Sequence, residues 1–251
     1  KWAISNDYDN AYAQVNYNKI EYGNTTSGGD GDYHGIYVRD SEVIGDTIIW
    51  VNDSIGDKTG GYAIHGQRLT VTDNYINSAG WGHGKTLIHV HSTHENGRWQ
   101  ILNNTIYSHE HQDAIYAEDY CDIENNYLNG IVNTDDGYSN EYAGIVVEGK
   151  CKIKNNQVIG YKYGVHADGS GNDNNEITNN YFEIRYYGIW GNDSRGEHLV
   201  ENNVFNRYGS DWSNDWLIYY TNAASVTLQN NHFEATVGKG LYFNNTGVTM
   251  N

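Results

Sequence analysis

Two short phrases of alternating apolar and polar residues recur along this chain. The first reads apolar, any residue, Asn-Asn, any residue, apolar, and residues 101–106 are one copy of it. Its second Asn stands at positions 74, 104, 126, 156, 180, 203 and 231, so the steps are 30, 22, 30, 24, 23 and 28 residues. Alternation with period two is the pattern of strands, and we see no helical periodicity. Each copy therefore predicts two short strands joined by a bend.

A second phrase lies between the copies of the first. It consists of a small or apolar residue, an aliphatic residue, a variable residue, and a small or apolar residue. Copies stand at 63–66, 87–90, 114–117, 144–147, 164–167, 188–191, 217–220 and 240–243. Repeats of this length with several short strands predict the coils of a parallel β-helix, stacked at the strand spacing of about 4.8 Å. Aliphatic rows would point inward. Asn-Asn would occupy a bend, because Asn accepts left-handed φ and its amide can bond the Asn above and below.

These repeats resemble the right-handed parallel β-helix of the pectate-lyase-like superfamily. The resemblance covers nearly the whole chain, since residues 3–20 also fit one coil. It implies an all-β solenoid of about nine coils, with inward aliphatic rows and Asn ladders. We expect residues 1–251 to be a single domain cut from a longer chain. Members of the superfamily include polysaccharide lyases, glycoside hydrolases, epimerases, tailspike depolymerases and adhesins, so the resemblance is specific for architecture and weak for activity.

Two details of this fold stay open in the sequence. Residues 38–45 match 153–160, whereas 35–38 and 48–51 match the second phrase, so the register between 33 and 61 is undecided. Cys121 and Cys151 each precede the first Ile of their phrase by two residues. Both are expected to point inward at neighbouring positions, either as a disulfide or as two buried thiols.

The charge and composition of the chain limit the classes of partner that it can bind. The formal net charge of −17 argues against nucleic acid and anionic membranes as partners. The chain contains no apolar run of about 18 residues, so the sequence predicts no membrane-spanning helix. Aromatic residues make up 14% of the chain, which argues against disorder.

The outward positions of the second phrase and of the residues after it form two columns. The first column is His65, His89, Tyr116, Val146, His166, Trp190, Tyr219 and Tyr242. The second column is Gln67, His91, Glu118, Glu148, Asp168, Asn192, Thr221 and Asn244. Aromatic faces stack on sugar rings, and carboxylates or amides bind hydroxyl groups. We therefore predict a polysaccharide groove here, although an ordinary exposed sheet would also carry Tyr and His. The predicted substrate-binding residues are His65, Gln67, His89, Tyr116, His166, Trp190, Asn192 and Tyr219.

Four polar loops that precede these strands are the predicted walls of the groove. They are residues 80–84, 109–113, 132–138 and 211–216. Long loops carried on a rigid scaffold are where binding and catalytic residues concentrate.

Three acids of the second column suggest the chemistry. Glu118 and Glu148 should be one strand spacing apart, and Glu118 and Asp168 two spacings, or roughly 9.6 Å. Carboxyl groups about 5–5.5 Å apart suit retaining glycoside hydrolysis, and about 6.5–9.5 Å suits inversion. We predict Glu118 or Glu148 as the general acid and Asp168 as the base, with His91 as a further catalytic residue.

Other readings of this face remain open. The acids could instead bind Ca²⁺ as a cofactor, because this cation takes several oxygen ligands. A lyase or epimerase could use His or Tyr as base, but it needs Ca²⁺, or Arg39 under one register, to neutralise the substrate carboxylate. His89 and His91 with Glu118 could hold a transition metal, but with 11 His in the chain such pairs arise by chance, and we predict no metal ligands.

The sequence as a whole predicts an extracellular or cell-surface enzyme that degrades polysaccharide, by hydrolysis rather than elimination. The alternative from another class is a non-catalytic glycan-binding adhesin or tailspike module. The sequence decides neither the sugar, the linkage nor the possible homo-oligomer.

Overall fold

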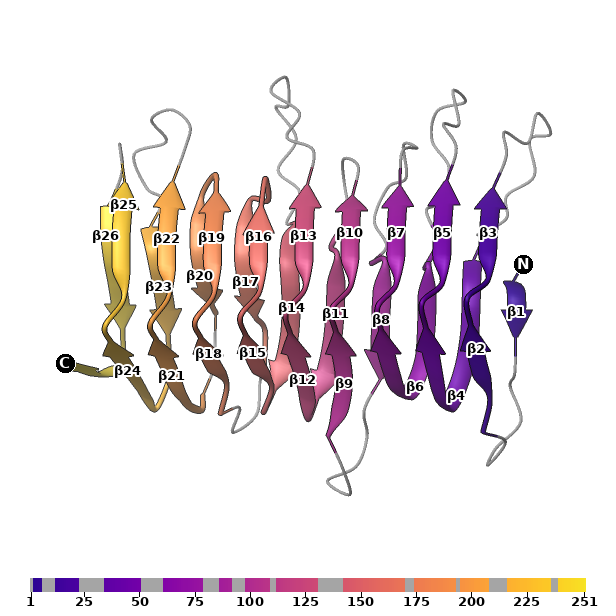
Figure 1. Ribbon diagram of the computed structural model, residues 1–251. Coiled ribbons are helices and arrows are strands. Elements are labelled where there is room, and N and C mark those ends of the chain that lie inside the picture. Colours follow the sequence, from indigo (N-terminus) through magenta and orange to yellow (C-terminus); the bar gives the residue numbers. More distant parts are fainter. Residues whose placement is uncertain are drawn as a thin grey trace.

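The computed structural model describes twelve stretches of the chain. They are residues 2–5, 12–22, 34–50, 61–78, 86–91, 98–108, 112–130, 142–169, 174–192, 195–207, 216–235 and 239–251. Within them the regular structure consists of strands, which lie side by side along one axis from the N-terminal to the C-terminal end (Figure 1). No helix in these stretches is long and apolar enough to cross a membrane.

One sheet holds nine of the described strands, each supplied by the second half of the Asn-Asn phrase or its equivalent. In chain order they are β3 (Lys19–Tyr22), β5 (Thr47–Trp50), β7 (Tyr75–Ser78), β10 (Thr105–Ser108), β13 (Tyr127–Gly130), β16 (Gln157–Ile159), β19 (Tyr181–Ile184), β22 (Val204–Arg207) and β25 (His232–Ala235). Each pairs in parallel with the equivalent strand of the next coil, as the repeat predicts.

A second sheet of 18 described strands contains two runs. The groove run, named for the predicted groove, is β1 (Trp2–Ser5), β4 (His34–Ile44), β6 (Ile64–Thr72), β8 (Ile88–His91), β11 (Ile115–Asp119), β14 (Ala143–Gly149), β17 (Tyr163–Ala167), β20 (Tyr187–Gly191), β23 (Trp216–Thr221) and β26 (Lys239–Asn244). The other run is β2 (Gln14–Asn16), β9 (Trp99–Leu102), β12 (Cys121–Glu124), β15 (Lys152–Lys154), β18 (Glu176–Thr178), β21 (Glu197–Glu201), β24 (Ser225–Gln229) and β27 (Gly247–Met250). The long strands β4 and β6 join the two runs, because each also pairs with strands of the other run.

Aliphatic residues of equal position in each coil form the core. Ile115, Ile145 and Val165 stand opposite one another in β11, β14 and β17 and are completely buried. The prediction of stacked inward rows is thus confirmed. Each coil alone exposes its apolar face, so burial of these rows between neighbouring coils stabilises the solenoid.

The two Asn residues of the first phrase have different roles. The first adopts the left-handed conformation, with φ of 55° at Asn155 and 57° at Asn179. The second is buried and forms a ladder through the coils. In the ladder, Asn156 accepts hydrogen bonds from the backbone and side-chain amides of Asn126, and it donates to Asn180 and to the carbonyl oxygen of Ile123. Side-chain bonds therefore satisfy the backbone groups that the bend leaves without a strand partner.

The structure decides the register that the sequence left open. Ile36 pairs with Ile64 and Val43 pairs with Val71, so residues 35–38 are a copy of the second phrase. Ile48 pairs with Ile76, so residues 48–50 belong to the strand of the first phrase and not to the second phrase, whereas residue 51 lies outside the described residues. The match of 38–45 to 153–160 is coincidental, because both stretches alternate with the same period. As a consequence, Asp46 occupies a ladder position in place of Asn, between Asn18 and Asn74.

The two cysteines lie where the phrase predicts them. Cys121 and Cys151 are completely buried in neighbouring coils, and both are free thiols. The Cys151 thiol donates to the carbonyl oxygen of Gly149 at 3.1 Å. The hydrogen bond with the neighbouring Cys151 thiol, followed by burial, raises the pKa of Cys121 well above its usual value. The structure therefore corresponds to the alternative of two stacked buried thiols.

Replacing Asp46 with Asn should stabilise the protein by about 1–3 kcal/mol at pH 7. The Asp46 side chain is completely buried, and its Oδ2 has no hydrogen-bond partner among the described residues. Burial raises the pKa of this carboxyl above 3.8, whereas the hydrogen bonds from Asn18 act in the opposite direction. An Asn amide could donate to the ladder, as Asn74 does to the carbonyl of Val43.

The sign of the pH dependence follows from the raised pKa. The folded state binds the Asp46 proton more tightly than the unfolded state, so ionisation penalises folding only above the unfolded pKa. The gain from Asp46→Asn should shrink as the pH falls through the raised folded pKa toward 3.8. Urea unfolding of both proteins at several pH values between 7 and 4 measures this difference in the free energy of unfolding. Asp73→Asn, at an exposed left-handed position, is the control and should change little. An equal gain at every pH would contradict this account.

Candidate functional site

The register of the groove run aligns the predicted site residues in two columns. His65 pairs with His89, His89 with Tyr116, and Tyr116 with Val146 in the first column. His166, Trp190, Tyr219 and Tyr242 continue that column coil by coil. The second column contains Gln67, His91, Glu118, Glu148, Asp168, Asn192, Thr221 and Asn244, which follow the same pairings two residues later. The sequence prediction that these side chains share one face therefore agrees with the geometry.

Arg39 stands at the N-terminal end of the second column. It pairs with Gln67, because residues 35–38 are a copy of the second phrase. The structure thus has the register under which Arg39 reaches the groove. The Arg39 guanidinium donates to the Tyr37 hydroxyl at 3.2 Å. The sequence could not place Arg39, because the two competing registers satisfied the same alternation.

Three acids occupy consecutive coils in the middle of the groove run. Ala117 pairs with Val147 and Asp119 with Gly149, so Glu118 stands opposite Glu148. Asp168 follows in the next coil, where its backbone amide donates to the carbonyl of Val147 at 2.9 Å. Glu148 and Asp168 are exposed, and 23% of the Glu118 side chain is exposed. A bound ligand can therefore reach all three carboxylates.

Tyr116 links this acidic group to the first column. Its hydroxyl donates a hydrogen bond to Oε1 of Glu148. Burial, this hydrogen bond, and the charges of Glu148, Glu118 and Asp168 all raise the pKa of Tyr116. The phenol is therefore protonated at neutral pH and acts as a hydrogen-bond donor rather than as a base.

Three histidines lie together on the N-terminal side of the acids. Nε2 of His65 lies 2.8 Å from Nε2 of His91, and Nδ1 of His91 is hydrogen-bonded to Glu118. The His89 ring packs against both, with ring centroids 4.9 Å from His65 and 4.0 Å from His91. Burial, followed by the neighbouring His91 and His65, lowers the pKa of His89 to about 3. At pH 7 the His89 imidazole is thus neutral.

Aromatic rings gather on the C-terminal side of the acids. Trp190 stacks on Tyr163 with centroids 5.1 Å apart and contacts the ring of His166 at 4.3 Å. Tyr219 stacks on Tyr242 at 4.9 Å. Along the axis of the solenoid, the groove therefore presents first histidines, then acids, then aromatic rings.

Some predicted residues are less accessible than the sequence suggested. His166 is 8% exposed and Thr221 is 7% exposed. Trp190 covers His166, and the Thr221 hydroxyl donates to the side-chain oxygen of Asn192 at 3.1 Å. His166 and Thr221 therefore support Trp190 and Asn192, and it is these two residues that lie at the surface of the groove.

A third column of side chains lies three residues before the first column, and it was not predicted from the sequence. It includes Tyr62, whose ring stacks on His65 at 4.4 Å. It also includes Tyr163 and Tyr187, which stack on each other at 5.5 Å. Each of these tyrosines stands two residues before an inward Ile or Val, where strict alternation predicts an inward side chain, so the period of two did not indicate them.

The predicted walls lie almost entirely outside the described residues. This applies to 80–84, to 109–111, to 132–138 and to 211–215, and therefore to His83, His109, His111 and Asp135. Three residues at the ends of these loops are described, namely Gln112, Asp113 and Trp216. The Asp113 carboxylate accepts from the backbone amide of Ala143 at 2.6 Å, and the Trp216 ring packs on Tyr242 at 5.0 Å.

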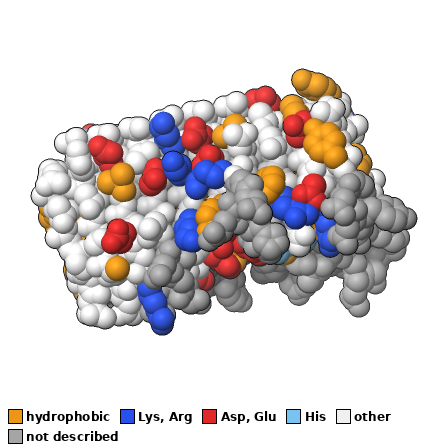
Figure 2. Space-filling model, turned by 90° about the horizontal axis from the view of Figure 1, so that it is seen from below, with side chains coloured by type: hydrophobic (Ala, Val, Ile, Leu, Met, Phe, Trp, Pro, Cys, Tyr) orange, Lys and Arg blue, Asp and Glu red, His pale blue; other side chains and the backbone are white. Residues whose placement is uncertain are grey.

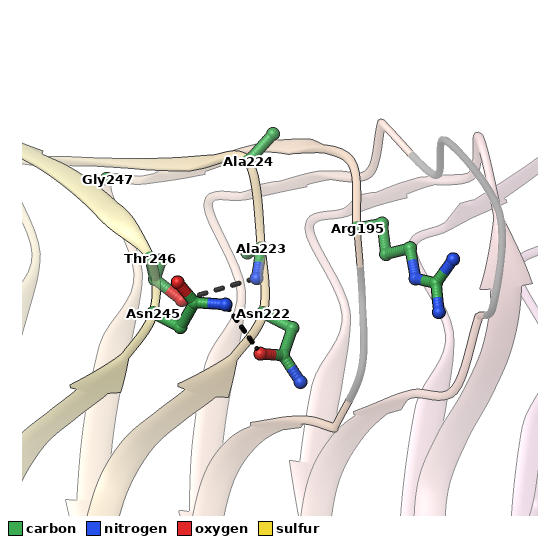
Figure 3. A pocket seen from close by; sticks show the side chains of 7 residues that line it. All are labelled: Arg195, Asn222, Ala223, Ala224, Asn245, Thr246 and Gly247. Atoms are coloured by element: carbon green, nitrogen blue, oxygen red, sulfur yellow. Dashed lines mark hydrogen bonds between the residues drawn. The ribbon is translucent and has the colours of Figure 1, made fainter.

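A shallow open depression lies at a corner of the last coils, lined by Arg195, Asn222, Asn245 and Thr246 among others (Figure 3). Its polar groups bond to one another, because Asn245 donates to Asn222 and the Ala223 amide donates to Thr246. Figure 2 shows Lys and Arg side chains interspersed with Asp and Glu on the face that it views, with no large patch of one sign.

Comparisons with known proteins agree with the architecture. Residues 143–251 match the family described as right handed beta helix region. Together with the parallel pairing of the described strands, this match confirms the predicted right-handed parallel β-helix. The comparison with curated proteins gave no match, and the comparison with solved structures gave none either. The family description contains no activity, so the function is argued from the groove alone.

Proposed function

We propose that this protein is an enzyme that cleaves a polysaccharide bound along the groove run, by hydrolysis of glycosidic bonds. The observation that carries the proposal is the alignment of Glu118, Glu148 and Asp168 in consecutive coils of one column. These acids come from positions far apart in the sequence, and only the coil register brings them together. We further propose that the protein acts outside the cell or at its surface, where such substrates are found.

Neighbouring groups support a catalytic rather than a merely solvated acidic stripe. Tyr116 donates to Glu148, and His91 is hydrogen-bonded to Glu118, so two of the three carboxylates are held in position. Trp190 and Tyr219 lie in the column beside them and offer aromatic faces to sugar rings. In the second column, Gln67 lies on the N-terminal side of the acids and Asn192 on the C-terminal side, and both have amides that suit hydroxyl groups.

The spacing of the acids allows two stereochemical outcomes. Neighbouring coils place Glu148 and Asp168 about 4.8 Å apart at Cα, which suits the retaining mechanism with a carboxylate nucleophile. Glu118 and Asp168 are two coils apart, about 9.6 Å, which leaves room for a water molecule and suits inversion. In either case Glu118 or Glu148 donates the proton to the leaving oxygen, and Asp168 acts as base or nucleophile.

Elimination by a lyase is the second candidate, because the register brings Arg39 into the groove. Arg39 could neutralise the carboxylate of a uronate, which this reaction requires. The pKa values of two candidate bases disfavour it. His89 is a weak base with a pKa of about 3, and Tyr116 keeps its proton because its pKa is raised. Hydrolysis therefore remains the first candidate.

A panel of neutral and acidic polysaccharides tests the proposal. We expect shortened products with the mass of added water and without new ultraviolet absorbance. An unsaturated product absorbing in the ultraviolet would instead indicate a lyase. Binding of a glycan without any cleavage would contradict the enzymatic proposal and favour an adhesin or tailspike module. For a cleaved substrate, the anomer formed first, observed by NMR, decides between the neighbouring and the separated acid pair.

A further inference from the structure

His65, His89 and His91 form a compact group of imidazoles at the N-terminal side of the acids. One ring nitrogen from each lies within 4.8 Å of those of the other two. They come from two neighbouring strands, β6 and β8, whose register places His65 opposite His89. The strands of a packed β-helix are rigid, so these side chains start from fixed backbone positions.

The hydrogen bonds of the group leave nitrogen atoms facing one another. Nδ1 of His91 is bonded to Glu118, so this nitrogen carries the proton and Nε2 of His91 presents its lone pair. That Nε2 atom faces Nε2 of His65 at 2.8 Å. Nε2 of His89 is buried, with no hydrogen bond to any described residue, and it lies 4.0 Å from Oε1 of Glu118. The facing nitrogens of His65 and His91 share one hydrogen bond, whereas Nε2 of His89 has no hydrogen-bond partner among the described residues. A cation between the three rings would be bound by all three nitrogen atoms.

Glu118 stands where a supporting carboxylate is expected in a metal site. Ligating histidines usually donate their second ring N–H to a carboxylate, which fixes the tautomer and the ring orientation. His91 and Glu118 have this relation. The ligand set therefore has an orienting residue as well as three donors.

The donor atoms indicate which ions fit. Imidazole nitrogen suits borderline transition-metal ions such as Zn²⁺, whereas Ca²⁺ requires several oxygen ligands. With Zn–N distances of about 2.0–2.1 Å, tetrahedral ligand nitrogens stand about 3.3 Å apart. On metal binding the 2.8 Å pair would open slightly and the wider pairs would close.

We infer that His65, His89 and His91 bind one divalent transition-metal ion of the Zn²⁺ class, with Glu118 as the residue that positions His91. Three protein ligands leave a fourth position for water or a substrate oxygen. The rings are partly exposed, 13% for His89 and 30% for His91, so this position is open to the groove. Metal binding by itself does not depend on the proposed hydrolysis. If both hold, Glu118 is committed to His91, and Glu148 with Asp168 becomes the reacting pair.

Zinc titration of the metal-free 251-residue chain tests the inference, with the bound metal measured after dialysis and the visible spectrum of the Co²⁺ form as a second readout. We expect one ion per chain. His65→Ala, His89→Ala and His91→Ala should each weaken binding by at least about 100-fold. Glu118→Gln, which preserves shape, should weaken it about 10–100-fold. The control is His232→Ala, at an exposed histidine that is hydrogen-bonded to Glu234, and it should bind as the parent does.

Two outcomes would overturn the inference. In the first, the parent chain binds neither Zn²⁺ nor Co²⁺ at about 100 µM metal, a concentration at which weak surface sites begin to bind. In the second, all three His variants bind the metal as the parent does. Circular dichroism of each variant establishes that the fold is intact. Because no glycan is needed, a failure here leaves the proposed hydrolysis untouched. A failure to cleave any polysaccharide likewise leaves the metal site untouched.

Discussion

Glu148→Gln and Asp168→Asn should each reduce the rate of glycan cleavage by about 10²–10⁴-fold. Each substitution keeps the shape of the side chain and removes its ability to exchange a proton or to act as nucleophile. Glu148 accepts the hydrogen bond of Tyr116, and Asp168 stands in the next coil of the same column. Steady-state kinetics on whichever polysaccharide the panel identifies would measure the loss.

The matched control for this prediction is Glu183→Gln. Glu183 also accepts a hydrogen bond from a tyrosine hydroxyl, that of Tyr181 at 3.2 Å, but it lies in the nine-stranded sheet. Its amide variant should cleave as fast as the parent. If Glu148→Gln, Asp168→Asn and Glu118→Gln all keep full activity, the acids of the groove are not catalytic. The chemistry must then be sought in the loops that contain His109 and Asp135.

Asn156→Ala should destabilise the protein by about 3–5 kcal/mol. Asn156 is 1% exposed and stands in the middle of the ladder. Its loss removes the acceptor for the backbone amide of Asn126 and the donor to the carbonyl of Ile123. Both groups are buried, so neither finds water in exchange, and each unsatisfied group costs about 1–3 kcal/mol. Chemical denaturation followed by circular dichroism would measure the difference.

The neighbouring Asn155 provides the contrast, because its role is conformational. It is exposed and holds φ of 55°, which glycine adopts without a steric penalty. Asn155→Gly should therefore be nearly neutral, whereas Asn155→Ala should cost about 1–2 kcal/mol. Equal effects of alanine at 155 and 156 would show that the ladder contributes nothing beyond the bend.

Much of the fold could be predicted because a solenoid repeats the same pattern of buried and exposed positions in each coil. The second Asn must be buried and the inward Ile or Val must stack, so every coil carries the same signal. The acidic column followed from counting two residues onward from each phrase. By contrast, His65 and His91 are 26 residues apart and stand diagonally across two strands, so the sequence suggested only His89 and His91 with Glu118 as a metal-binding group.

The sequence by itself determined the parallel β-helix, the buried rows, the Asn bends and the alignment of Glu118, Glu148 and Asp168, because period-two alternation and coil length specify which residues face inward. Only the tertiary structure decided the register of Arg39 and the place of Asp46 in the ladder. Alternation is satisfied by more than one register, and only pairing with the neighbouring coils selects between them. The structure also decided that three imidazoles converge on one another, since side-chain directions depend on contacts across strands that no single repeat contains.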